Sequence, residues 1–308
     1  DEACRASVLS RANAPETLNT IIPLKCTTKK ICLSKDGSDC NEFIGEEKVD
    51  AVKLSFSTEE SVKLIEQTYV EEMYRCWDVM GQGKLDLFSG GLLKATGLEP
   101  TKDNVCVICS RIALNIEDED LKKEITEKIN INDYMRETQV PGKSATYLNL
   151  FTDKSVNSFA RAPEQISEET EKKLADQDKN PIVEFSSNTN EFAILFTQIK
   201  PSGYLETLGT LENLGLTGAG LTFVPPGLNK IALKILGTGY GAVIAVVGAG
   251  GVTVYSMLNV RAGQVAAAGY CGALTSKESA KEGCSTVQIV PYDVQVINKI
   301  CGRIEGSA

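Results

Sequence analysis

The stretch ILGTGYGAVIAVVGAGGVTVYSMLNV, residues 235–260, decides the expected fold because it contains no charged residue. Lys234 precedes it and Arg261 follows it. A membrane-crossing helix needs roughly 20 apolar residues, and this run is long enough. Such a run must be covered by lipid, by identical subunits or by an unusually thick core. We therefore expect one long hydrophobic helix over residues 230–262.

The glycines of this run indicate what would cover the helix. Gly237 and Gly241 are spaced so that two helix backbones could approach closely. In water, a glycine weakens an isolated helix by about 1 kcal/mol relative to alanine. We expect contact with lipid or sister helices; the alternative is buried strand and loop inside one domain. The residues expected to form this assembly or membrane contact are Gly237, Gly241, Val243, Val247, Gly248, Gly251 and Val254.

A dinucleotide site is excluded at the same place. VVGAGGVT, residues 246–253, resembles the start of a G-x-G-x-x-G fingerprint, but Thr253 occupies the third glycine position. The acidic residue that should follow is replaced by alanines at 266–268. Too few residues remain to build the doubly wound sheet that such a site requires. No cofactor is expected.

Composition excludes several classes of function. The formal net charge is −9 and no cluster of Lys and Arg appears, which argues against nucleic acid. The chain has no histidine, which removes histidine-based metal sites and triads. Asp86, Asp118 and Asp133 are interpreted as surface acids. We expect no catalytic or metal residues, no small-molecule substrate and no enzyme; a hydrolase using Ser–Lys or paired carboxylates is the alternative.

The cysteines indicate an oxidising compartment. An even number at irregular spacings in an acidic chain is typical of a disulfide framework. The sequence starts Asp-Glu-Ala, which we interpret as a mature chain after signal-peptide cleavage. All ten cysteines are expected in disulfides: Cys4, Cys26, Cys32, Cys40, Cys76, Cys106, Cys109, Cys271, Cys284 and Cys301.

Two features of the cysteine pattern make sharper predictions. Cys106 and Cys109 form a lone C-x-x-C, which could be a redox pair or half of a zinc site; we expect instead two half-cystines with different partners.

Seven cysteines precede the apolar run and three follow it, so complete pairing requires a bridge between the two sides. Because a single membrane crossing would separate the flanks, a re-entrant hairpin or a helix packed on sister copies is favoured.

Periodicity predicts the other elements. Ser57 and Glu60 have capping-box spacing, and apolar residues then recur at helical intervals up to Met80. Near the end of this helix, Cys76 is expected to bridge to Cys106 or Cys109 beside Trp77. Further predictions are a stapled hairpin or loop layer in residues 1–50, helices at 117–138 and 292–301, and strands at 182–186, 192–199 and 287–290.

These elements suggest five segments. We expect a cysteine-rich mixed domain at 1–162, a polar spacer helix at 163–180 and a β-rich segment at 181–229. The hydrophobic helix follows at 230–262, and a small cysteine-stapled unit at 263–308 packs back on the first domain. The expected fold class is therefore α+β, with disulfide-stapled extracellular domains and one long Gly/Ala-rich helix toward the C-terminus.

Several motifs resemble an uncharacterised group of proteins. MYRCWDVMGQGKLDLF (residues 73–88) and CVICSRIAL (106–114) are similar to a pattern in uncharacterised secreted proteins of small-genome archaea. Tyr147-Leu148 and GCSTVQIVPYD (283–293) fit the same pattern. The resemblance implies an archaeal cell-surface setting, and it carries over no activity and no catalytic residues.

The expected function follows from these observations. A structural cell-surface or extracellular protein that self-assembles into a filament, tube or envelope layer fits best, with identical subunits as partners. The alternatives are a single-pass membrane-anchored adhesin or receptor ectodomain, and a membrane-inserting pore or fusion protein.

Overall fold

The computed structural model describes residues 2–15, 18, 21–37, 40–88, 104–151, 190–199, 222–223, 233–238, 241–248, 251–255, 267–275 and 280–306. Within these residues, eleven strands form one sheet in the order β2-β1-β3-β4-β10-β9-β8-β7-β6-β5, with β11 beside β3. The strands are β1 (Lys29–Ser34), β2 (Val49–Lys53), β3 (Asn104–Asn115), β4 (Glu191–Ile199), β5 (Thr222–Phe223), β6 (Leu233–Thr238), β7 (Gly241–Gly248), β8 (Gly251–Tyr255), β9 (Ala267–Thr275), β10 (Ala280–Pro291) and β11 (Arg303–Glu305).

The sheet changes character at β3. On one edge of β3, β1 pairs with residues 110–115 and β11 with residues 105–107, both in parallel. The other edge pairs antiparallel with β4, with a bulge between Ile108 and Ser110. From β4 to β5 every pairing is antiparallel. The mixed α and β content confirms the coarse fold class.

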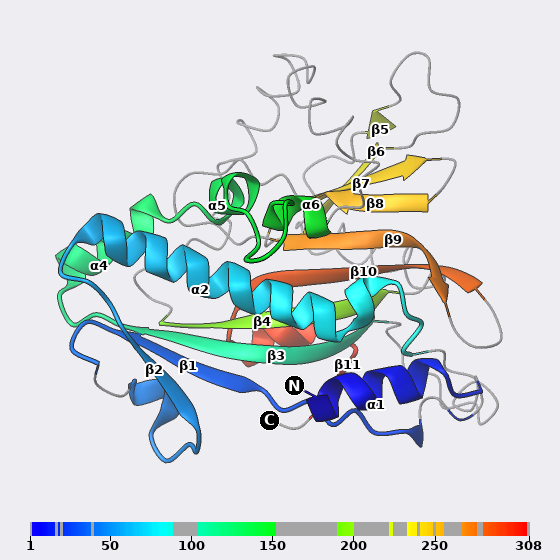
Figure 1. Cartoon of the computed structure of the whole chain (residues 1–308), viewed down its shortest axis with the longest axis horizontal. Helices are drawn as coiled ribbons and strands as arrows, with labels where there is room; N and C mark the ends of the chain where they lie inside the picture. The colour runs from blue at the N-terminus through cyan, green and yellow to red at the C-terminus, as the bar shows by residue number, and fades with distance from the viewer. Residues whose placement is uncertain are drawn as a thin grey trace.

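Helices cover the sheet unevenly. The longest, α2, lies in front of β3, β4 and β10, whereas α9 lies on the opposite face of the sheet (Figure 1). The helices are α1 (Glu2–Ala12), α2 (Thr58–Val79), α4 (Glu119–Lys128), α5 (Ile131–Glu137), α6 (Tyr147–Phe151) and α9 (Val294–Ile300), with 3-10 turns η2 (Asn41–Phe43) and η3 (Gly81–Gly83).

Helix α2 confirms its prediction from the sequence. The side chain of Ser57 accepts a hydrogen bond from the backbone N–H of Glu60, which satisfies an otherwise unpaired donor of the first turn. The apolar stripe, including Ile65, Met73 and Trp77, is buried. Gly81 follows the helix with φ +70°, a left-handed conformation that glycine adopts without strain.

The second predicted helix is divided. Residues 117–138 form α4 and α5, separated at Ile129 and Asn130. Asp118 caps α4 by accepting from the backbone N–H groups of Asp120 and Leu121, and Asn130 caps α5. An Asn side chain competes with continued helix by satisfying the backbone locally, which explains the break.

The core lies on both faces of the sheet. Successive residues of a strand face opposite sides, so β4 contributes to two clusters. Ile194 and Phe196 belong to the large cluster that includes α2. Ala193 and Leu195 pack with Ile297 of α9 in a second cluster. Buried β4 and β10, together with α9, confirm the strands and helix expected at 192–199, 287–290 and 292–301.

The N-terminal layer differs from its prediction. Its bridges are confirmed, since Cys4 bonds to Cys26 and Cys32 to Cys40. The expected hairpin is wrong, because β1 and β2 run parallel with a longer connection between them. The unpredicted helix α1 buries Val8 and its neighbours and contacts α2 and η3.

The expected helix at 230–262 is wrong for the residues that the structure describes, where β6, β7 and β8 form antiparallel hairpins. Only two residues separate β6 from β7 and β7 from β8, and each pair includes a glycine. Short glycine-containing connections between β-branched segments favour hairpins over helix. In the described ranges, no helix is long and apolar enough to span a membrane. The spacer at 163–180 and the strand at 182–186 lie outside them.

Candidate functional site

The residues expected to form one assembly surface are divided by the sheet register. Residues that alternate along a strand share a face, as do directly paired residues of neighbouring strands. Val243 and Val247 therefore share one face of β7, and Val254 joins it because it pairs with Ala245. Gly241 is on that face as well. Gly237, Gly248 and Gly251 occupy the opposite face. The spacing that suggested one helix surface thus describes two sides of a sheet.

The C-x-x-C motif is structural. Cys106 bonds to Cys301 and Cys109 bonds to Cys76, so the two cysteines have different partners, as expected. Residues three apart on a strand face opposite sides, which explains why one bond reaches α2 and the other reaches the end of α9. The Cys106–Cys301 bond also confirms the bridge between the two sides of the apolar run. These four disulfides are compatible with an extracellular protein.

A network of charged side chains fastens α2 to the sheet. Glu72, 7% exposed, accepts from Lys29 Nζ at 2.8 Å and from Arg75 Nε at 2.7 Å. The Ser110 hydroxyl donates to Glu72 at 2.7 Å, and an Arg75 Nη2 donates to the carbonyl of Cys109. Each oxygen of this buried carboxylate is therefore bonded, as a buried charge requires.

The pKa of Glu72 reflects this network. Burial alone would raise the pKa of the carboxyl group, but the charge of Arg75 and the hydrogen bonds from Lys29 and Ser110 outweigh burial and lower it. The carboxylate is therefore held in its charged form between cations. This arrangement suits a fixed structural tie, since a proton acceptor at neutral pH needs a higher pKa.

A second network surrounds Arg111 on β3. Its guanidinium group lies 4.1 Å from the ring centre of Tyr292 and 5.1 Å from that of Phe43. Arg111 also donates to Glu191 and Glu46. The residues come from η2 and its following loop, β3, β4 and the segment after β10, so Arg111 joins parts of the chain that are distant in sequence.

The two carboxylates around Arg111 have opposite pKa shifts. Burial raises the pKa of Glu191, whereas hydrogen bonds from Lys30 and Arg111 lower the pKa of Glu46. Carboxyl pairs with separated pKa values occur in acid–base catalysis. Here one guanidinium group binds both carboxylates and stacks on the aromatic rings, so both carboxylates are already paired with a cation.

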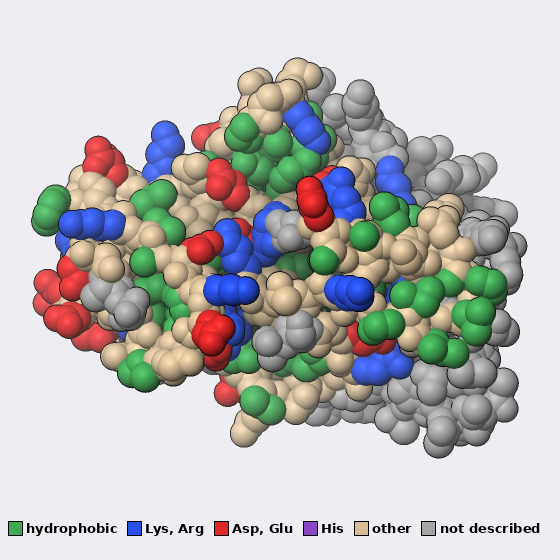
Figure 2. Space-filling view, turned by 60° about the horizontal axis from the view of Figure 1, so that its bottom comes forward, with side chains coloured by type: hydrophobic (Ala, Val, Ile, Leu, Met, Phe, Trp, Pro, Cys, Tyr) green, Lys and Arg blue, Asp and Glu red, His purple; other side chains and the backbone are tan. Residues whose placement is uncertain are grey.

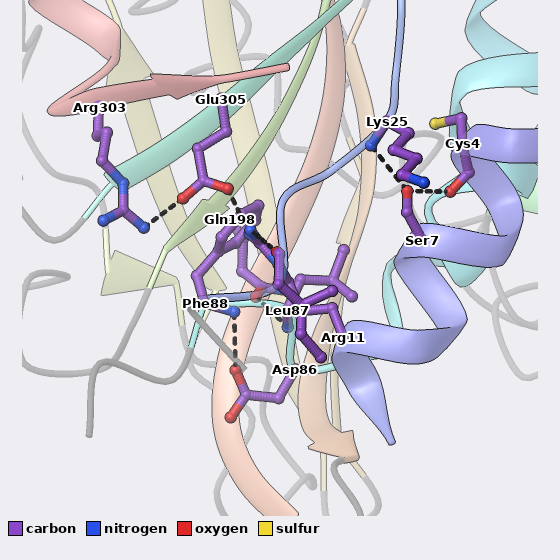
Figure 3. Close-up of polar contacts among 11 residues, drawn as sticks. Cys4, Ser7, Arg11, Lys25, Asp86, Leu87, Phe88, Gln198, Arg303 and Glu305 are labelled. Atoms are coloured by element: carbon purple, nitrogen blue, oxygen red, sulfur yellow. Dashed lines mark hydrogen bonds and ion pairs between the residues drawn. The ribbon is translucent and has the colours of Figure 1, made fainter. Parts of the chain in front are cut away.

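A third network links the two ends of the described chain (Figure 3). Arg11, 2% exposed, pairs with Glu305 of β11 and donates to the carbonyl of Ile22. Arg303 pairs with the other carboxylate oxygen of Glu305. Helix α1 is thereby fixed to the last strand, close to the Cys4–Cys26 bond.

Beside this network, Gln198 holds the segment that follows η3. Its amide accepts from the backbone N–H of Leu87 at 3.0 Å and donates to the carbonyl of Leu85 at 2.8 Å. Asp86 lies in the same segment and is 3% exposed, so its interpretation as a surface acid is wrong. Asp118 caps α4, and Asp133, 50% exposed, pairs with Arg136.

Figure 2 shows how the charged side chains are distributed over one face of the molecule. On the face in Figure 2, several Lys and Arg side chains near the middle lie among Asp and Glu side chains, and a group of Asp and Glu side chains lies at the left edge. Among the described residues, no group of three or more His, Cys, Asp or Glu side chains could hold a metal ion. Comparison with known protein families, known proteins and solved structures finds no match.

Proposed function

We propose that the chain is a structural protein of the cell surface or extracellular space that assembles with copies of itself through β6, β7 and β8. The observation that supports this is the composition of β7, GAVIAVVG, in which every position is apolar or glycine. Such a strand has two apolar faces, and strands of this kind are normally covered on both sides.

The arrangement of the helices supports the same proposal. Helix α2 packs on β3, β4 and β10, and α6 packs on β9. Within the described residues, no helix makes comparable contact with β6, β7 or β8. A second copy that packs on these strands would stabilise the assembly by about 25 cal/mol for each Å² of apolar surface buried between the copies.

The proposed setting is the cell surface or the extracellular space. Four disulfides that connect α1, β1, α2, β3 and the end of α9 suit an oxidising compartment. Buried networks such as those of Glu72 and Arg111 rigidify the same region. A rigid stapled body beside an apolar strand surface is the form that a repeating structural unit requires.

The experiment places a charge on the proposed surface. Val247→Lys introduces an ammonium group in β7, opposite Val252 of β8. The matched control is Ala51→Lys, at an exposed position of β2. Full-length chains with intact disulfides are compared by size-exclusion chromatography with light scattering, without detergent, and Trp77 fluorescence verifies that each variant retains its core.

We expect oligomers for the unmodified chain and for Ala51→Lys, and a shift of at least tenfold in the concentration needed for assembly with Val247→Lys, since a buried unpaired charge is costly. A folded Val247→Lys chain that assembles as the unmodified chain does would contradict the proposed surface. If the chain is monodisperse only in detergent, lipid rather than further copies of the chain covers these strands.

A further inference from the structure

Lys122 is a lysine in a position where the helix pattern calls for an apolar residue. It lies on the inward side of α4 with Ile125 and is 3% exposed. Lysine is almost never fully buried without a partner. Its Nζ donates to Oδ1 of Asn190 at 2.6 Å, and a carboxylate oxygen of Glu119 lies 3.8 Å from the same Nζ.

Both ends of this contact are fixed by the backbone. On one side, the Asp118 cap and the backbone bond from Lys122 N–H to the Asp118 carbonyl set the first turn of α4. On the other side, the backbone N–H of Leu114 donates to the carbonyl of Asn190 at 2.7 Å, which extends the β3–β4 pairing to this residue. The amine and the side-chain amide are therefore held together by two regular elements.

This geometry suits a reaction between the two side chains. A donor that hydrogen-bonds to a carbonyl oxygen lies roughly 3–3.5 Å from the carbonyl carbon, which is the separation of reacting atoms, and attack on Cγ further requires Nζ to move out of the amide plane. The Lys122 side chain is 4% exposed, whereas the Glu119 side chain is 70% exposed and Asn190 is exposed, so only the amine is shielded from water. The Glu119 carboxylate is within reach to accept and return a proton.

We propose that Lys122 and Asn190 form an intramolecular isopeptide bond with Glu119 as the proton carrier. The neutral Lys122 amine, after giving a proton to Glu119, attacks Cγ of Asn190. A bond between Nζ and Cγ forms and the bond between Cγ and Nδ2 breaks. Nζ loses a second proton as the new amide forms, and Nδ2 takes up this proton and the one returned by Glu119, so that it leaves as ammonium. A protonated primary amine and a primary amide become a secondary amide and ammonium, so no oxidant or further reactant is required.

The bond would join residues 68 positions apart. It would link α4 to the first residue before β4 and add a covalent tie to the disulfides of the same sheet. Unlike a disulfide, this tie would persist under reducing conditions. The proposal does not depend on self-assembly, since it concerns contacts within one chain.

The test is the intact mass of the full chain, purified, denatured and completely reduced. We expect a mass lower than that of the sequence by one ammonia, and a tryptic digest in which the peptides of Lys122 and Asn190 remain joined. A full unmodified mass, with trypsin cleaving after Lys122, would overturn the proposal. Ammonia loss that maps to any other residue would overturn it equally.

Variants test the roles within the site. Lys122→Arg retains a cation but removes the primary amine, and we expect the full mass. For Glu119→Gln, the joined peptides should form on the order of 100-fold more slowly after refolding, because general acid–base catalysis contributes about that factor. The matched control is Glu127→Gln, an exposed acid of the same helix, with the bond unchanged. Equal rates in the two variants would overturn the role of Glu119.

Discussion

Cys106 of β3 and Cys301, directly after α9, are joined by a disulfide across a sequence separation of 195. The bonded cysteines lie on opposite sides of the apolar run at 235–260. A bond between them requires both flanks to reach the same compartment. The segment around Cys301 is thereby fixed to β3, with which β11 also pairs.

Removal of this bond should destabilise the protein strongly. For the double substitution of Cys106 and Cys301 by serine, we expect a loss of about 2–5 kcal/mol in the free energy of unfolding, because a cross-link that closes a long loop restricts the unfolded chain. The measurement is denaturant unfolding followed by the fluorescence of Trp77, the sole tryptophan. The comparison is removal of Cys32–Cys40, with a separation of 8, which should cost less. A larger cost for the short loop would contradict the account.

Cys271 and Cys284 should form a fifth disulfide. The register places them directly opposite each other on β9 and β10, and the other eight cysteines are already bonded to one another. Peptide mapping without reduction should recover these two cysteines in one linked pair. Recovery of either as a free thiol, or bonded to a third cysteine, would show that the pairing is different.

The network of Glu72 predicts a specific pH dependence. Its pKa is lowered from 4.5 in the folded protein, so its contribution to stability is present above that value and is lost as the pH falls through the folded pKa. Glu72→Gln should cost about 1–3 kcal/mol near neutral pH. In urea titrations, the difference from the unmodified protein should shrink in acid. A difference that stays constant or grows toward low pH would refute the role of this charge.

Gly83 should not tolerate substitution, because its backbone is left-handed and the ring of Trp77 lies against it. Its φ is +69°, and an added Cβ would lie 2.2 Å from a ring carbon of Trp77. Gly83→Ala should therefore cost about 2–5 kcal/mol, the sum of overpacking and left-handed strain. Gly142→Ala is the control, with φ +75° and open space around it. It should cost only about 1–2 kcal/mol. Equal unfolding midpoints for the two variants would contradict the packing of Trp77.

The sequence predicted correctly those features that a short motif or a residue count determines. Ser57 and Glu60 predicted the start of α2, and the cysteine count predicted a bridge across the apolar run. The helix expected at 230–262 was wrong because we interpreted its small residues as sites of contact between helices. The glycines cluster at the ends of β-branched segments, where hairpin connections occur, and that spacing was the missed signal.

The burial of the polar side chains could not be predicted from the sequence, for a different reason. Asp86 carries no local sign of burial, because its segment is held by Gln198 and by the carbonyl of Thr275, which are far away in the chain. Lys122 did carry a signal. It replaces an apolar residue in the stripe shared with Ile125, although only the structure shows that Asn190 and Glu119 meet it there.

The central claim is that β6, β7 and β8 are covered by further copies of this chain. Sedimentation velocity of the full, disulfide-intact protein over a wide concentration series, without detergent, tests it most directly. The account predicts sedimentation coefficients that rise with concentration toward a defined assembly. A single species with the mass of one chain at every concentration would contradict it.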